Sequence, residues 1–521
     1  RQDHSYAVNL SVNHTVTPRT YYTARIYRYT TDSKLAPSML FDQYWSRWPG
    51  YSEDNQGTYT GSIYESNQLA SNQYEGLPFT DGSDFFPVYR KAHTTYYGLR
   101  FDLSSQITFR NQIRAGLETQ WYKLDWDEKS FLQATISGQQ YSANPVEGAL
   151  YIQDKLELAR LIVNAGVRMD YFDTGQRFFV NLPNGLTELR NSPTKIRFSP
   201  RIGLSHPFTS RSLWRFSYGY FFQPPEFRFA YENLQRDLSG DFPRLGNPNL
   251  DPQKTVAYEF GLEHALTDHL RTGLTGSYKK ISNLTSISQV QYPGGSYSIF
   301  TNADFGTVRS IEFFMRRDIS RILSGSLNYT FSNAQGTASS PQETSSIRPS
   351  ARNQTVIPIL NVFPMAFDQR HTMSGVINII TPNTWRKRFL GIPLDEWSLS
   401  IIGYYGSGMP YTPTNSLGEQ TDSKPNLARL PSLINMDLRL RKRFQFRQFS
   451  YAFFTEIQNV LNRRNIISVY ANTGDPDDDG YTVEAFTGQT EEFTRLRRLL
   501  SLDPQHYSPP RAFRVGFEIG F

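Results

Sequence analysis

One segment of the chain gathers aromatic rings around a single cation. Residues 41–51 read FDQYWSRWPGY, and the side chains of interest are Tyr44, Trp45, Arg47, Trp48 and Tyr51. Aromatic faces beside a guanidinium can grip a flat or glycan-like ligand through stacking and cation–π contacts. The same rings can instead pack a long loop onto its neighbours. Ligand contact and loop packing are therefore both open for this segment.

A second segment, residues 474–486, reads GDPDDDGYTVEAF and carries an acidic side chain at every second position of its first half: Asp475, Asp477 and Asp479. Carboxylates at this spacing, followed by Gly480, match the first half of a calcium-binding loop. The twelfth position of such a loop would be Phe486 instead of the usual Glu. The segment is thus interpreted either as a calcium site or as a solvated acidic turn.

Two further polar groups are candidates for binding. Glu226 and Arg228 follow a Pro pair that ends a strand and begins a loop, so they can contact a ligand or pack the loop. Basic residues also alternate along one stretch near the C-terminus: Arg439, Arg441 and Arg443. We expect these three to line a lumen or its periplasmic rim, where they attract an anionic solute or pair with carboxylates of a plug.

No recognised catalytic arrangement is present. His371 lies beside Asp368 and Arg370, but at the start of a strand this trio indicates a structural hydrogen-bonding cluster. The sequence has no H-E-x-x-H, no G-x-S-x-G, no phosphate-binding glycine loop and no Cys/His array. We therefore expect no enzyme activity.

Composition narrows the class of protein. The chain has 521 residues, no Cys, 15% aromatic residues and a formal net charge of +6 without a basic tract. Nothing in it resembles a nucleic-acid-binding module, so no nucleic-acid partner is expected. No apolar run approaches the roughly 18 residues that a membrane-spanning helix needs. A membrane β-barrel escapes that limit, because every second residue of its strands can be polar.

The last ten residues, AFRVGFEIGF, have the pattern of a barrel strand. Charged residues and glycines alternate with apolar residues, which are Phe513, Val515, Phe517, Ile519 and Phe521. Because side chains alternate faces along a strand, one face of this segment is fully apolar. Roughly ten tilted residues also suffice to cross a bilayer as a β-strand.

The same alternation recurs through the chain. Val256, Tyr258, Phe260 and Leu262, for example, are interleaved with polar or small residues that include Glu259. A charged second face fits a hydrated interior better than a packed core. The sequence therefore predicts an all-β fold, a transmembrane antiparallel β-barrel.

Connections between the expected strands alternate between short and long. Short turns are expected near 17–18, 104–105, 160, 207–211, 267–268, 318–321, 382–396 and 444–448. Long loops are expected over 32–92, 125–147, 173–194, 223–253, 282–304, 333–367, 408–431 and 463–509. Short periplasmic turns and long extracellular loops are typical of outer-membrane barrels.

The strand count suggests an incomplete barrel. We expect about 17 strands, whereas single-chain bacterial barrels have an even number. The chain also opens with RQDHSYAVNL, without an initiator Met or a signal peptide. Residues 1–521 are therefore expected to form the C-terminal part of one barrel domain, with the first barrel strands encoded upstream.

Several motifs, taken together, resemble the TonB-dependent outer-membrane receptors, especially the branch that carries a carboxypeptidase-regulatory-like domain. They are GNPNLDPQKTVAYEFGLEHAL (246–266), FDQRHTMSGVINI (367–379), RLPSLINMDLRLRKRF (429–444), FFTEIQNVLNRRN (453–465), ALYIQDKLELARLIVNAGVRMDYF (149–172) and SPRIGLSHPF (199–208). Each motif is degenerate, but the combination is specific and covers about residues 94–521.

This resemblance implies a 22-stranded barrel around an N-terminal plug, in the outer membrane of a Gram-negative bacterium. It also implies four kinds of partner: outer-membrane lipid, the plug, the barrel-assembly machinery, and an inner-membrane energy-transducing complex. The expected function is capture of an extracellular ligand and energised import. A surface scaffold for partner proteins and a passive porin are the alternatives.

Overall fold

A computed structural model describes most of the chain. The residues outside the description are 1, 36–87, 131–136, 182–186, 237, 239–242, 293–294, 321, 342, 344–360, 386, 416–417, 419, 422–423, 447, 481–494, 496–498, 500 and 521. Among the described residues, no helix has the length and apolarity required to cross a membrane.

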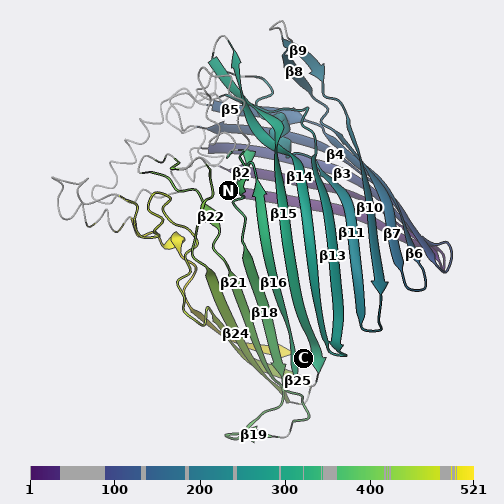
Figure 1. Cartoon of the computed structure of the whole chain (residues 1–521), viewed down its shortest axis with the longest axis vertical. Helices are drawn as coiled ribbons and strands as arrows, with labels where there is room; N and C mark the ends of the chain where they lie inside the picture. Colours follow the sequence, from purple (N-terminus) through teal and green to yellow (C-terminus); the bar gives the residue numbers. More distant parts are fainter. Residues whose placement is uncertain are drawn as a thin grey trace.

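The described strands form one large antiparallel meander (Figure 1). Its long strands, each hydrogen-bonded to the next, are β1 (Gln2–Thr17), β2 (Thr20–Leu35), β3 (Val88–Gln106), β4 (Asn111–Ser130), β6 (Val146–Glu157), β7 (Ile162–Asp173), β10 (Lys195–Pro207), β11 (Ser212–Gln223), β13 (Gln253–Thr267), β14 (Leu270–Tyr292), β15 (Gly295–Ser320), β16 (Leu323–Gly336), β18 (His371–Ile380), β21 (Trp397–Gly406), β24 (Leu433–Phe446), β25 (Phe449–Gln458) and β26 (Ala512–Gly520). These are 17 strands, so the predicted count and the all-β class are confirmed.

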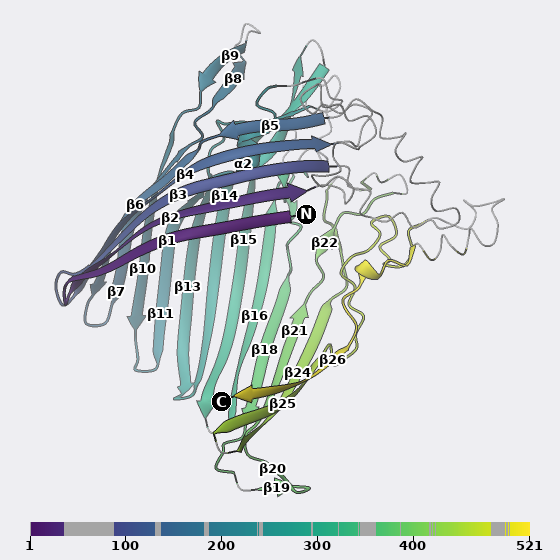
Figure 2. The ribbon, with the colours of Figure 1, turned by 180° about the vertical axis from the view of Figure 1, so that it is seen from behind.

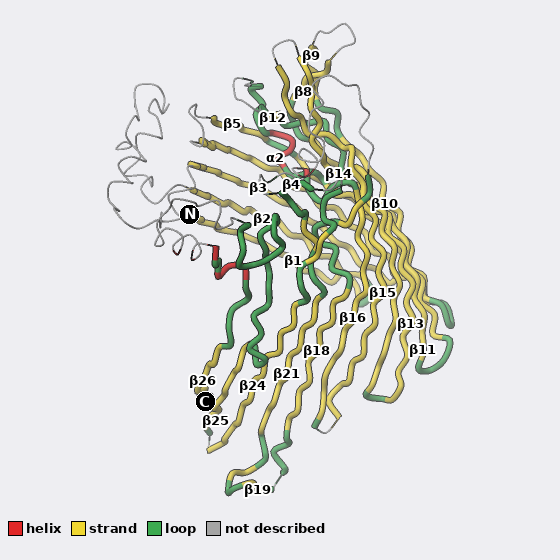
Figure 3. The backbone as a smooth tube through the Cα atoms, turned by 60° about the vertical axis from the view of Figure 1, so that its left-hand side comes forward, coloured by secondary structure: helices red, strands yellow, loops and turns green. Residues whose placement is uncertain are grey.

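Shorter strands lie in the long connections. Within the main sheet they are β5 (Ser137–Ala143), β12 (Arg244–Leu245) and β17 (Phe363–Pro364). Three separate hairpins pair β8 (Arg177–Asn181) with β9 (Thr187–Asn191), β19 (Arg388–Phe389) with β20 (Ile392–Pro393), and β22 (Pro410–Tyr411) with β23 (Ala428–Arg429). The predicted alternation of short and long connections holds along the meander except between β14 and β15, where the connection is short (Figure 3).

One predicted turn is misplaced. Ser104 and Ser105 lie inside β3, and the turn follows at 107–110. A serine pair resembles a turn in sequence, but here both hydroxyls have partners across the sheet. The Thr20 and Ser105 hydroxyl oxygens are 2.7 Å apart, and Gln112 donates to Ser104. Cross-strand partners therefore let the strand continue through the pair.

The sheet curls (Figure 2), and its two faces carry different kinds of side chain. In β13, the side chains of Tyr258, Phe260 and Leu262 are 43–49% exposed on the convex face. Their neighbour Glu259 lies on the concave face, 3.9 Å from Arg215 of β11. Over residues 258–262 of β13, apolar side chains thus face outward and the charged one faces inward. This is the arrangement of a wall between lipid and a hydrated lumen.

The predicted loop over 282–304 is wrong, because β14 and β15 continue through it as one long hairpin. The pairing register shifts between Ile281 and Thr285, and Asn283 there adopts a φ of 60°. Such a bulge breaks the two-residue period on which strand prediction depends. The hairpin extends well past the roughly ten residues that a membrane crossing needs.

The two outermost strands of the sheet are β1 and β26. Within the described residues, β1 pairs only with β2, and β26 pairs only with β25. Closure as a 22-stranded barrel stays a prediction.

A buried carboxylate fastens two of the long connections to the wall. Asp368, 1% exposed, accepts from the backbone N–H of Ala334 at 2.7 Å. It also accepts from Arg370 at 2.7 Å and from Arg429 at 2.5 Å. His371 instead lies 2.9 Å from the Tyr329 hydroxyl. Asp368 and Arg370 thus form part of a hydrogen-bonding cluster, without the histidine side chain among the donors to the carboxylate.

Replacing Asp368 by Ala leaves the Arg370 and Arg429 cations and the buried Ala334 N–H without their acceptor. Because losing one partner of a buried ion pair leaves an uncompensated charge, the expected loss of unfolding free energy is about 3–5 kcal/mol. Urea unfolding of the refolded protein measures it. The matched control is Asp318→Ala, whose exposed carboxylate bridges Arg271 and Arg316, and whose expected loss is at most about 1 kcal/mol. Equal losses in the two variants would contradict this role for Asp368.

At the opposite end of the wall, Lys442 holds a short connection. Its side chain is 6% exposed, and its ammonium donates at 2.9 Å to the Asp395 carboxylate. This hydrogen bond lowers the pKa of Asp395. Because the folded-state pKa lies below the unfolded value of about 3.9, the contact stabilises the fold above that value and is lost as the pH falls through the folded pKa.

The fall of the melting temperature at acidic pH tests this contact. We expect the melting temperature of the wild type to fall faster below about pH 4 than that of Asp395→Asn, which has no carboxyl group to protonate. Heat-dependent mobility in detergent gels, measured from pH 3 to pH 7, follows the melting. Superimposable acid limbs for the two proteins would rule the contact out as a source of acid sensitivity.

Candidate functional site

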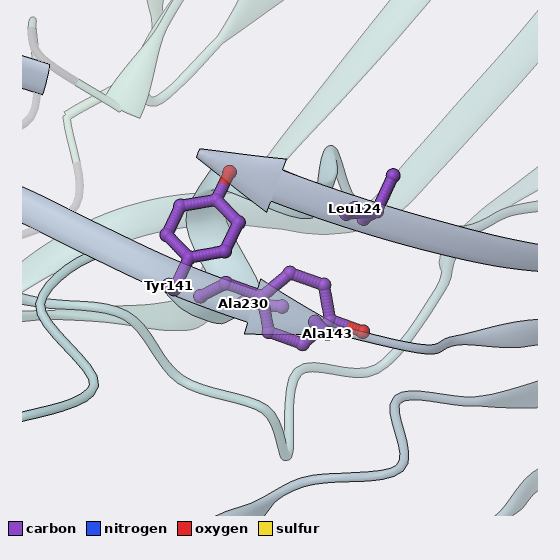
Figure 4. Packing of buried hydrophobic residues seen from close by; sticks show 5 residues of the cluster. Leu124, Tyr141, Ala143 and Ala230 are labelled. Atoms are coloured by element: carbon purple, nitrogen blue, oxygen red, sulfur yellow. The ribbon is translucent and has the colours of Figure 1, made fainter. Parts of the chain in front are cut away.

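One long connection folds back onto the concave face. This inner loop, residues 224–252, contains the short helix α2 (Phe227–Tyr231). Ala230 and the fully buried Tyr231 of α2 pack against Leu124 of β4 and against Tyr141 and Ala143 of β5 (Figure 4). The Tyr231 hydroxyl donates to the carbonyl of Thr174 at 2.9 Å, and burial raises the pKa of this phenol. The helix is thereby anchored to the wall.

The far end of the inner loop reaches the β14–β15 hairpin. Leu250 packs with Ile287 and Phe300, and the rings of Phe229 and Phe300 are 4.8 Å apart. Asn247 donates to the carbonyl of Phe300 at 2.8 Å. The inner loop therefore connects two stretches of wall, β4–β5 and β14–β15, that are distant in the sequence.

An ion-pair cluster stiffens this loop. Glu232, with a side chain 2% exposed, accepts from Arg228 at 3.1 Å and from Arg244 at 2.6 Å. Arg228, a predicted ligand-binding residue, thus has a structural partner. Glu226, the second predicted ligand-binding residue of this loop, precedes the helix, is exposed and makes no capping hydrogen bond. A ligand contact by either residue stays a prediction.

A continuous row of aromatic rings leads across the concave wall to α2. Tyr29 of β2, Tyr96 of β3 and Tyr122 of β4 lie opposite one another in register. Successive ring centroids along the row Tyr29, Tyr96, Tyr122 and Phe227 are 5.3, 5.2 and 5.0 Å apart. Rings at these distances attract one another beyond the effect of their burial, so they form a preorganised surface.

Polar groups accompany the row, which we call the aromatic row. Tyr27 also packs edge-on against Tyr96, with ring centroids 6.1 Å apart. Its ring covers Gly98, where an added Cβ would lie 2.1 Å from the Tyr27 Cζ atom. The Tyr27 hydroxyl accepts from Gln120 at 2.8 Å, and Gln120 in turn accepts from Tyr122. Stacking faces and hydrogen-bonding groups are thus offered together, as ring-containing solutes require.

The predicted aromatic loop 41–51, with Tyr44, Trp45, Arg47, Trp48 and Tyr51, lies outside the described residues.

The acidic segment is described up to Gly480. There Asp477 accepts from Tyr507 at 2.7 Å, which raises the pKa of that phenol, and Asp475 accepts from the backbone of Asp477. In the described part of the chain, no three acidic, His or Cys side chains converge to hold a metal. Calcium binding here stays a prediction.

The three predicted lumen arginines lie on the concave side of β24. Arg439 and Arg441 share the Glu518 carboxylate of β26, at 3.4 and 2.6 Å. Arg443 lies 3.3 Å from Glu396, in the short connection before β21. Within the described wall these cations therefore have partners of their own. Contacts with an anionic solute or with a plug stay predictions.

The C-terminal strand presents its apolar set outward. The apolar side chains of β26 are 48–75% exposed; they are Phe513, Val515, Phe517 and Ile519. Phe517 packs on Phe453, with ring centroids 4.8 Å apart. Phe521 lies outside the described residues. A role of this strand in membrane insertion stays a prediction.

The aromatic row was missed at the sequence level, because its members come from four separate segments. One signal was available. Tyr96 and Tyr122 each stand an even number of residues from a charged neighbour, Arg100 and Glu118 respectively. They therefore lie on the charged face of their strands instead of the apolar face. An aromatic ring in the polar phase of a barrel strand points into the lumen.

Comparisons with known proteins agree with this architecture. Residues 2–460 match the family described as TonB dependent receptor-like, beta-barrel. No curated protein matches the sequence. Similar solved structures include the copper transporter OprC, at a TM-score of 0.57 and 11% identity over 99% of this chain and 65% of that one.

Two others are named for iron. The FrpB iron transporter from Neisseria meningitidis has a TM-score of 0.53 at 10% identity, over 88% of this chain and 59% of that one. The ferric yersiniabactin uptake receptor FyuA from Yersinia pestis has a TM-score of 0.55 at 10% identity, over 89% of this chain and 57% of that one. The chain thus spans 57–65% of the length of these three structures.

At such low identity these structures show a shared fold and nothing about cargo. The family match covers most of the chain, and the 17-stranded meander with lipid-facing and lumen-facing sides agrees with it. The carboxypeptidase-regulatory-like branch stays a prediction. The chain is an outer-membrane β-barrel protein and belongs to the TonB-dependent receptor family.

Proposed function

We propose that this chain forms the wall of a receptor that captures an extracellular ligand and imports it into the periplasm, driven by an inner-membrane energy-transducing complex. The observation that carries the proposal is the aromatic row on the concave face, which ends at α2 of the inner loop. A row of rings on the lumen side serves no lipid contact. Its place beside an inward-folded loop suits a ligand on its way through the barrel.

The proposed ligand contains rings, as a glycan or an aromatic metal chelate does. Tyr96, Tyr122 and Phe227 offer stacking faces, and Gln120 and the tyrosine hydroxyls offer hydrogen bonds. The long connections, including the 41–51 segment, are proposed to supply the first contacts. In the complete protein an N-terminal plug is proposed to occlude the lumen, and the barrel-assembly machinery to insert the wall.

Co-purification identifies the ligand. The complete protein is isolated from native outer membranes, and bound small molecules are released and identified by mass spectrometry. Uptake of the identified compound is then compared in cells with and without the energy-transducing complex. We expect uptake to stop when that complex is removed. A surface scaffold would instead yield only partner proteins and no energy-dependent uptake.

Removal of one ring from the row weakens binding of the co-purified compound. For Tyr122→Ala and for Phe227→Ala, we expect affinity to fall about 3- to 10-fold, because one stacked aromatic contact contributes about 0.5–1.5 kcal/mol. Isothermal titration with the purified protein measures the change. Tyr151→Ala is the control, since Tyr151 bonds Asp102 on the same face but lies outside the row. A fall confined to the control would contradict ligand contact by the row.

Electrical conductance separates a plugged receptor from a passive porin. We expect the complete protein to be nearly closed in a planar bilayer, because the proposed plug fills the lumen. Urea that unfolds the plug alone should open large channels reversibly. Large, steady conductance of the untreated protein would establish the porin alternative instead.

A further inference from the structure

The convex face of the wall carries an apolar groove. It has a volume of about 450 Å³ and runs across β11, β13, β14, β15 and β16. Its walls are Phe216, Phe260, Ile311 and Phe331, and its floor is Gly276. In register, Gly276 lies between Phe260 and Ile311, and an added Cβ there would have no atom within 4 Å. The missing side chain of one glycine therefore creates the groove.

The groove lies just on the short-turn side of a row of three tyrosines on neighbouring strands. Tyr218, Tyr258 and Tyr278 follow one another in register, with centroids 4.8 and 6.3 Å apart. From Leu270, at the short-turn end of β14, a rise of about 3.3 Å per residue and a tilt of about 40° place Tyr278 roughly 20 Å up the wall. The apolar band of such a barrel is about 25 Å tall, with aromatic girdles at its borders. The tyrosines thus mark the extracellular border, and the groove faces the outer leaflet.

Three cations stand on the convex face at this border. Arg309 lies 5.9 Å from the centre of the Tyr278 ring and lines the groove. Lys280 follows two residues after Tyr278, on the same face, and the Lys254 ammonium lies 4.1 Å from the centre of the Tyr220 ring. Among the residues that the structure describes, none of the three forms an ion pair. An excess of unpaired positive charge at the lipid surface attracts anionic headgroups.

The polar rim contains one further unusual group. Asn333 lies opposite Arg309 in register, and its side-chain oxygen is buried without a hydrogen-bond partner among the described residues. Buried polar atoms normally have a partner, so this oxygen is an exception in the wall, and it is enclosed too fully to reach a molecule outside the wall. The one acidic residue that lines the groove, Glu259, instead lies on the concave side near Arg215.

We propose that this groove is a binding site for a phosphorylated glycolipid of the outer leaflet, of the lipid A type. One acyl chain lies over Gly276 between the aromatic walls. A headgroup phosphate contacts Arg309 and Lys280. The apolar groove and the basic rim together match one amphipathic, anionic molecule, whereas contact with lipid chains alone would not require the basic rim.

Native mass spectrometry of the complete protein with added lipid A tests the site. Gly276→Trp fills the groove, and we expect it to weaken lipid A retention about tenfold, a change of the size that one well-buried contact supplies. Gly403→Trp is the matched control, because Gly403 lies on the convex face of β21 with equally open surroundings. Equal retention by wild type and Gly276→Trp would overturn the proposal.

A charge variant tests the rim while leaving Gly276 and the apolar walls of the groove unchanged. We expect the double variant Arg309→Gln, Lys280→Gln to lose lipid A about tenfold but to bind dephosphorylated lipid A as the wild type does. Lys279→Gln is its control, since Lys279 carries the same charge on the opposite face of β14. Retention of phosphatidylglycerol as strong as that of lipid A would show nonselective lipid contact and would also overturn the proposal.

Discussion

Backbone hydrogen bonding is the constraint on which this wall depends. Lipid offers no partner to a peptide N–H or C=O group, so each strand within the bilayer must bond to a neighbour. The unbroken succession of antiparallel pairings from β1 to β26 meets that demand for every interior strand. Side-chain contacts then act on a sheet whose arrangement is already determined by its backbone hydrogen bonds. Asp368 and Lys442 fasten connections at the ends of the strands and do not hold the strands together.

Because backbone hydrogen bonds lie in the plane of the sheet, the side chains on its two faces can differ. One sheet can therefore face lipid on one side and water on the other. The convex side presents Phe260 and Ile311 to lipid, and the concave side carries arginines, carboxylates and the aromatic row. The inner loop adds a third layer on the concave side. Its contacts with Tyr141 and Phe300 join distant parts of the wall, so ligand-facing groups sit on a braced surface.

Much of the architecture could be predicted from sequence, because it rests on a two-residue period and on connection length. The strand number, the two faces and the outward set of β26 all follow from that period. Prediction failed where the period was broken, as at the Asn283 bulge, and where a pair of residues inside a strand resembled a turn, as at Ser104 and Ser105. The aromatic row and the groove at Gly276 depend on which strands become neighbours. Register supplies that information, and a single sequence does not contain it.

Strict alternation of faces also limits how such a wall can diverge in evolution. Inserting one residue within a strand would turn every following lumen side chain toward lipid, and the reverse. Insertions and deletions are therefore confined to the connections, or to bulges such as the one at Asn283 that absorb an extra residue. Cargo preference within the wall can change only by substitution, one position at a time. The long loops can change in length as well, so they are free to diverge faster than the surface behind them.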